Sequence, residues 1–121
     1  MLQGLCEAVL YVNDMAKMVD FYRGSLGLTL TFPQGVEDFA DQHWIMFDTG
    51  QCTLCLHKWE QPLNGSFNPE LVYKVQDIHA AHAWLQGLGI TPNEPHEVAP
   101  GIWIVNARDP EGNLISFEAR T

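Results

Sequence analysis

The chain repeats itself at a spacing of 63 residues. Residues 7–14 (EAVLYVND) align with residues 70–77 (ELVYKVQD); each block begins with glutamate, runs through mostly apolar residues and ends in valine-x-aspartate. This duplication constrains the fold more than any single motif, because two copies of one supersecondary unit must bury their apolar faces together. One copy of about 60 residues buries too little apolar surface to be stable alone, so we expect both copies to form one domain.

A helix is predicted after each repeated block, because apolar residues follow it at helical spacing. Asp14 and Asp77 precede the helical residues, at the position where a side chain caps a helix N-terminus. Gly27 and Gly89 each follow a leucine at the predicted helix end, where glycine is the preferred residue. We therefore interpret both aspartates as caps and not as catalytic groups. The apolar positions are Met15, Met18, Phe21, Tyr22 and Leu26 in the first copy and Ile78, Ala81, Leu85 and Leu88 in the second.

Three strands are expected after each helix, from alternating apolar residues bounded by turn residues. The predicted fold is α+β, with two βαβββ repeats forming a curved, partly open mixed sheet and the helices on its convex side. We expect a single domain over 1–121, with repeat 1 at about 4–58, a linker at about 59–69 and repeat 2 at about 70–120. The predicted strands that follow the helices span 28–35, 42–49, 51–58, 90–98, 101–108 and 113–120.

The charge balance argues against a nucleic-acid partner. Six Lys and Arg oppose fifteen Asp and Glu, a formal charge of −9, which repels phosphate backbones and anionic lipid. No basic leader and no apolar run of membrane-spanning length is visible, so we expect a cytoplasmic protein without membrane partners. The three cysteines, Cys6, Cys52 and Cys55, lie in apolar segments and are expected to be free thiols.

Strand alternation predicts which side chains line a pocket. On the first and last strand of each repeat, one row packs against the helices and the other faces the concave side. Trp44 and Trp103 are placed at matching positions on strands that border the same cavity, where they would stack on a planar ligand. The predicted inner set is Glu7, Tyr11, Cys55, His57, Glu70, Lys74, Ser116 and Glu118.

Three carboxylates and an imidazole that share a cavity repel or neutralise one another unless a cation holds them. One hypothesis is a divalent ion, Mn, Fe, Ni or Zn, bound by Glu7, His57, Glu70 and Glu118. The other is a hydrated polar floor in which Lys74 pairs with one glutamate. The residues alone leave both open.

Four short motifs, which occur in a fixed order along the two repeats, resemble those of one family. The chain is similar to the vicinal oxygen chelate superfamily, which includes glyoxalases, bleomycin-resistance proteins and extradiol dioxygenases. The resemblance covers nearly the whole chain and implies a small-molecule pocket and a homodimer. The motifs are Val12–Met15, Phe21–Tyr22, Leu26–Leu28 and Asp109–Ile115.

The resemblance also implies a metal-ligand pattern, from which this chain departs. In metal-using members of the family, each of the first, fourth, fifth and eighth strands supplies one metal ligand. Glu7 and Glu70 fall at two of these positions, whereas Cys55 and Ser116 stand at the other two. His57 and Glu118 lie two residues further on, so they serve as ligands only if the site is shifted.

Two functions follow from these patterns. In the first, the chain is a metal-dependent lyase, isomerase or dioxygenase, in which Glu70 or Glu118 is left as the general base beside a metal-bound substrate. In the second, the same pocket binds and sequesters a drug or metabolite without metal, as resistance proteins of the superfamily do. Its acidic lining and tryptophans favour a cationic or aromatic ligand.

Overall fold

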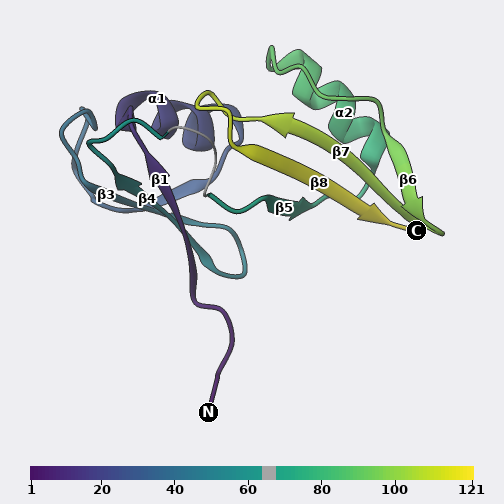
Figure 1. Ribbon diagram of the computed structural model, residues 1–121, viewed down its shortest axis with the longest axis horizontal. Coiled ribbons are helices and arrows are strands. Elements are labelled where there is room, and N and C mark those ends of the chain that lie inside the picture. Colours follow the sequence, from purple (N-terminus) through teal and green to yellow (C-terminus); the bar gives the residue numbers. More distant parts are fainter. Residues whose placement is uncertain (64–67) are drawn as a thin grey trace. The chain divides into compact units, whose positions relative to one another are not determined.

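The computed structural model describes residues 1–63 and 68–121, and residues 64–67 of the predicted linker lie outside the described residues. The chain divides into two compact units, Met1–Asn68 and Pro69–Thr121. Each unit has the order strand, helix, three strands, as the ribbon in Figure 1 shows. The predicted α+β class with two βαβββ repeats is therefore confirmed.

Each unit forms its own four-stranded mixed sheet. The sheets have the strand orders β1-β4-β3-β2 and β5-β8-β7-β6, and the first and last strands of each unit pair in parallel. The sequence led us to expect one continuous sheet, whereas the described strands pair within each repeat. The elements are β1 Glu7–Val12, α1 Met15–Val19, η1 Asp20–Ser25, β2 Thr29–Phe32, β3 Trp44–Asp48, β4 Thr53–Lys58, β5 Leu71–Lys74, α2 Ile78–Gly87, β6 His96–Ala99, β7 Ile102–Arg108 and β8 Leu114–Arg120.

The predicted helix caps are confirmed. The Asp14 carboxylate accepts from the Lys17 N–H at 3.1 Å, and Asp77 accepts from the N–H groups of His79 and Ala80 at 2.9 and 3.1 Å. These bonds satisfy amides that the first helical turn leaves without partners. Among the described helices, none has the length and apolar character that crossing a bilayer requires.

The first helix contains one more residue than the second. The repeats are 63 residues apart at Asp14 and Asp77 but 62 apart at Gly27 and Gly89. α1 accommodates the extra residue by widening into the π-helical segment η1, in which the Leu26 N–H donates to the Phe21 carbonyl five residues back at 2.9 Å. A single inserted residue is the usual origin of such a segment.

The strand expected at 90–98 was placed too early, since β6 spans only His96–Ala99. Pro92 and Pro95 lack the N–H that a ladder needs. Between these prolines Asn93 bonds β7 instead, accepting from the Asn106 N–H at 2.7 Å. The connections also differ, because residues 33–43 join β2 to β3 whereas only two residues, 100 and 101, join β6 to β7.

The core lies between each helix and its sheet. In the first unit the helix residue Tyr22 stacks at an angle on Phe47 of β3, with ring centroids 6.5 Å apart. In the second unit Trp84 of α2 meets the Phe117 ring of β8 edge-on at 6.2 Å, and α2 lies across β7 and β8 (Figure 1). The predicted alternation holds in both units. The fully buried residues of the helix-facing rows are Leu10, Val12, Ile45, Phe47, Leu54, Leu56, Val105 and Ile115.

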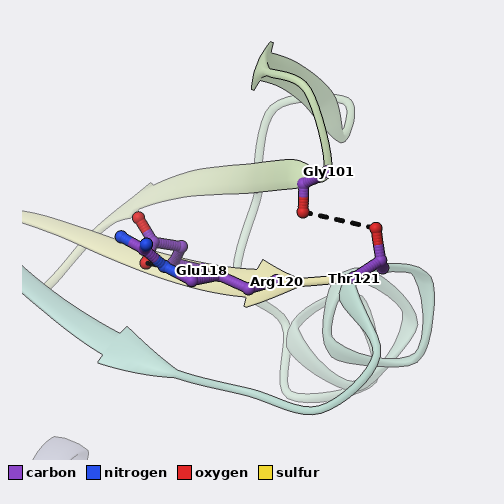
Figure 2. A network of polar contacts seen from close by, with 4 residues as sticks. All are labelled: Gly101, Glu118, Arg120 and Thr121. Carbon is purple, nitrogen blue, oxygen red and sulfur yellow. Dashed lines mark hydrogen bonds and ion pairs between the residues drawn. The ribbon is translucent and has the colours of Figure 1, made fainter.

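Two glycines with positive φ differ in what surrounds them. Gly101, at φ +76°, accepts at its carbonyl from the Thr121 N–H at 2.8 Å and from the Thr121 hydroxyl at 3.3 Å, as Figure 2 shows for the hydroxyl. A Cβ on Gly101 would lie 2.8 Å from the Thr121 carbonyl oxygen. Gly112, at φ +83°, has no atom within 4 Å of such a Cβ.

We predict that Gly101→Ala destabilises the chain more than Gly112→Ala. Both should lose about 1–2 kcal/mol because alanine disfavours the left-handed region, and Gly101→Ala should lose more because its Cβ also collides with backbone. Urea unfolding of both variants measures the difference. Equal losses would show that the end of β8 yields to the added carbon and does not fix this turn.

Candidate functional site

Four of the eight predicted inner residues form two half-sites of the same construction, one in each unit. Each half-site lies on the face of the sheet away from its own helix, which we call the inner face. In the first unit Cys55 pairs in register with Val9, and in the second Ser116 pairs with Val72. A glutamate, Glu7 or Glu70, lies two residues before the paired valine, so it reaches its partner diagonally across the parallel ladder.

The first half-site joins Glu7 to Cys55. The Cys55 thiol is fully buried and lies 3.5 Å from the Glu7 Oε2, to which it donates. Burial, followed by the hydrogen bond to Glu7, raises the pKa of the Cys55 thiol to about 12, because both effects oppose a thiolate. Cys55 is therefore a neutral hydrogen-bond donor to the carboxylate.

The second half-site joins Glu70 to Ser116 and extends further. The buried Ser116 hydroxyl donates to the Glu70 Oε2 in a short hydrogen bond and accepts from the Asn106 side-chain amide at 2.7 Å. Asn106 is fixed in turn by Asn93, whose side-chain amide donates to the Asn106 Oδ1 at 2.9 Å. The sequence analysis missed both asparagines, although Asn106 is the one polar residue within the apolar run 102–107.

His57 lies in an aromatic cluster and not beside Glu7. Its ring centroid is 5.2 Å from Tyr11, 5.7 Å from Trp44 and 6.2 Å from Trp59. The His57 Nδ1 is 2.9 Å from the Lys58 carbonyl oxygen; a carbonyl only accepts, so Nδ1 carries the proton and Nε2 can accept from a ligand. Trp59, which is 40% exposed and falls in the predicted linker, was not among the predicted residues.

Glu118 is held by an arginine that the sequence analysis did not single out. The Arg120 Nε donates to the Glu118 Oε2 at 2.8 Å, as Figure 2 shows. Lys74 is the register partner of Glu118 across β5 and β8. Arg120 follows Glu118 by two residues, so strand alternation could have placed both on one face.

Trp103 does not match Trp44, which corrects the sequence analysis. Trp44 pairs in register with His57, whereas the residue paired with Glu118 is Ile104. Trp103 pairs with the buried Ala119 and lies 5.7 Å, ring to ring, from His79 of α2. Because side chains alternate along a strand, this difference of one residue puts Trp103 on the helix side of its sheet.

The donors at two of the four ligand positions that the resemblance implies do not suit a divalent ion. Cys55 is a neutral thiol and Ser116 a hydroxyl, and each is already bonded to the glutamate beside it. His57 pairs with Tyr11, four residues along from Glu7, which is roughly 13 Å of strand. Taken unit by unit, over residues 1–63 and 68–121, no three His, Cys, Asp or Glu side chains gather in a way that could hold a metal.

The duplicated βαβββ units, each with a glutamate bonded to a neutral donor, define a glyoxalase-like fold. The sequence profile of the Glyoxalase/Bleomycin resistance protein/Dioxygenase superfamily matches residues 4–117. The chain belongs to this superfamily, which confirms the resemblance found in its motifs.

Individual relatives support the same fold. The chain is 29% identical over 129 residues to YraH, an uncharacterized protein of Bacillus subtilis (strain 168), with 93% of this chain and 95% of YraH covered. The solved glyoxalase family protein of Enterococcus faecalis has a TM-score of 0.78 at 17% identity, covering 96% of this chain and 97% of its own. TnmS3, an antibiotic binding protein from Streptomyces sp. CB03234, has a TM-score of 0.74 at 22% identity, with both chains fully covered.

We predict that the Cys55 thiol makes stability fall at alkaline pH. Its folded pKa, about 12, lies above the ordinary 9.0, so its stabilising contribution is complete below pH 9.0 and is lost as pH rises toward 12. Cys55→Ser keeps a donor for Glu7 without a thiol to ionise. The stability of the wild type relative to Cys55→Ser should therefore fall by up to about 1.4 kcal/mol per pH unit in this window.

Urea unfolding of both proteins between about pH 8 and about pH 11 measures this difference in slope. Cys6→Ser is the control, since Cys6 is exposed in the folded chain. A constant difference between wild type and Cys55→Ser across this range would contradict the buried, protonated thiol.

Proposed function

We propose that this chain is a small-molecule-binding protein that works without a metal, and that its ligand lies on the inner face of the first unit. The observation that carries this proposal is the pairing of Glu7 with Cys55 and of Glu70 with Ser116. At the positions where metal-using relatives are expected to supply ligands, this chain supplies neutral donors that bond its own carboxylates. Two of the four positions, Cys55 and Ser116, therefore supply neutral donors that bond the glutamates at the other two positions.

The aromatic cluster gives the ligand its chemical class. Tyr11, Trp44, His57 and Trp59 form a continuous set of ring contacts on one unit, and Trp59 is partly exposed to solvent. Aromatic faces attract cations, and the formal charge of −9 attracts them at longer range. A planar aromatic cation combines both attractions.

The comparison with TnmS3 supports a binding role, since that protein of the same fold is an antibiotic binding protein. The metal-dependent lyase, isomerase or dioxygenase considered from sequence, with Glu70 or Glu118 as general base, requires those carboxylates to face a substrate. Glu70 instead accepts from Ser116, and Glu118 accepts from Arg120. A homodimer, as the resemblance implies, is retained as part of the proposal and is tested by sedimentation.

We predict that the purified protein binds no stoichiometric divalent metal. Elemental analysis after incubation with Mn, Fe, Ni and Zn should give the same low content for the wild type and for the Glu7→Gln, Glu70→Gln double variant, because the thiol and the hydroxyl beside these glutamates are neutral donors and not further metal ligands. About one metal per chain, lost in the double variant, would overturn the metal-free proposal and favour the enzyme.

We predict that 1-methylquinolinium, a planar cation, binds at the aromatic cluster. Trp59→Leu and Tyr11→Leu should each weaken binding about tenfold, since one ring contact with a cation contributes about 1 kcal/mol or more. Isothermal titration measures the affinity. Phe32→Leu is the matched control, because Phe32 is an aromatic residue of the same unit that is 49% exposed and lies outside the cluster.

2-Naphthoate, an anion of similar shape, should bind at least tenfold more weakly than the cation. If the two compounds bound equally, or if Trp59→Leu and Phe32→Leu had the same effect on the cation, the assignment of the ligand to this cluster would fail.

A further inference from the structure

The second unit contains a cavity on the helix side of its sheet, on the opposite face from the half-site. Its volume is about 890 Å³, within the range of small-molecule pockets. Residues from the start of α2 and from β7 and β8 line it, and the surface they present is mainly apolar. The side chains that matter for its chemistry are Ile78, His79, Ala81, Trp84, Trp103 and Ala119.

The equivalent space in the first unit is covered by the chain itself. Lys58 is the counterpart of Ala119, since it follows His57 as Ala119 follows Glu118. The Lys58 ammonium donates to the Ala40 carbonyl at 3.0 Å, which holds the loop 33–43 against this position, and Phe39 in that loop is buried. The second unit has no such loop, because residues 100 and 101 alone join β6 to β7.

The start of the first helix is also covered. Asn13 donates to the carbonyls of Trp59 and Gln61, both at 2.9 Å, and so holds the segment after β4 beside the helix N-terminus. Gln76 occupies the equivalent position in the second repeat and lines the cavity. In the first copy this segment and the loop 33–43 are therefore both held by side-chain hydrogen bonds from residues at or next to the strand ends.

The helix itself contributes less volume in the second copy. Met18 and Ala81 stand 63 residues apart at the same helical position, and both side chains are buried. Replacing methionine by alanine removes three heavy atoms from the contact between helix and sheet. Protein interiors are normally packed to crystal density. The smaller side chain and the short connection between β6 and β7 therefore leave a volume in the second copy that a ligand can fill.

The lining selects the ligand. Trp84 and Trp103 both contribute indole rings, and aromatic side chains stack on planar ring systems. Asp77 also lines the cavity. Its carboxylate already accepts hydrogen bonds from the His79 and Ala80 amides at the start of α2, so the helix N-terminus compensates its negative charge. We infer that this cavity is a second ligand site, for an uncharged planar aromatic molecule.

Naphthalene is the probe, and quenching of tryptophan fluorescence together with ligand-induced NMR shifts on α2 measures its binding. Ala81→Met restores the residue of the first copy and should reduce affinity at least tenfold by filling the cavity. Trp103→Leu should reduce affinity by a similar factor through loss of a ring contact. Ala83→Met, on an exposed position of the same helix that does not line the cavity, should bind naphthalene as the wild type does.

Unchanged affinity in Trp103→Leu, or equal affinity in Ala81→Met and Ala83→Met, overturns the inference. If Ala81→Met fails to fold in thermal unfolding, Trp103→Leu decides alone. Trp103→Leu is also examined by sedimentation. If its molar mass differs from that of the wild type while naphthalene still binds, a second copy of the chain occupies the cavity, and the inference is overturned. Loss of naphthalene binding in Trp59→Leu would place the probe at the aromatic cluster, so failure here is distinct from failure of the proposed function.

Discussion

The parallel pairing of the first and last strand in each repeat is the contact on which the rest of the unit depends. A parallel connection needs a crossover of a dozen residues or more, and here the helix and two further strands provide it. The pairing of β1 with β4 brings Leu10 beside Leu56 on the helix side, where both are buried. On the other side it brings Glu7 within reach of Cys55. Core and half-site are thus two faces of one ladder.

Those parts of the fold that follow from strict periodicity were predictable from sequence. The repeat, the two aspartate caps and the buried rows rest on spacings of 3.6 and 2 residues, and the structure confirms them. Two departures from this periodicity come from single-residue changes in spacing. One inserted residue widens the first helix into η1, and a displacement of one residue puts Trp103 on the helix side of its sheet. Local composition does not reveal either change.

Within the site, sequence placed residues on faces but did not identify their bonds. Cys55 and Ser116 were expected on the inner face, yet the donation of each to a glutamate depends on a diagonal across the ladder that alternation alone does not fix. Asn106 and Arg120 were missed because each acts through a neighbour that was itself predicted, Ser116 or Glu118. Whether a carboxylate is open to a ligand is decided by such neighbours and not by its own position.

The two copies have diverged on opposite faces of the same framework. In the first, the helix side is closed by the loop 33–43 and the inner face carries the rings around His57. In the second, the inner face is occupied by the network from Glu70 through Ser116 to Asn106, while the helix side retains a cavity. Because successive side chains of a strand point to opposite faces, substitutions on one face leave the ladder and the other face intact. A duplicated unit can therefore acquire a ligand surface on either side while the parallel pairing that defines it is preserved.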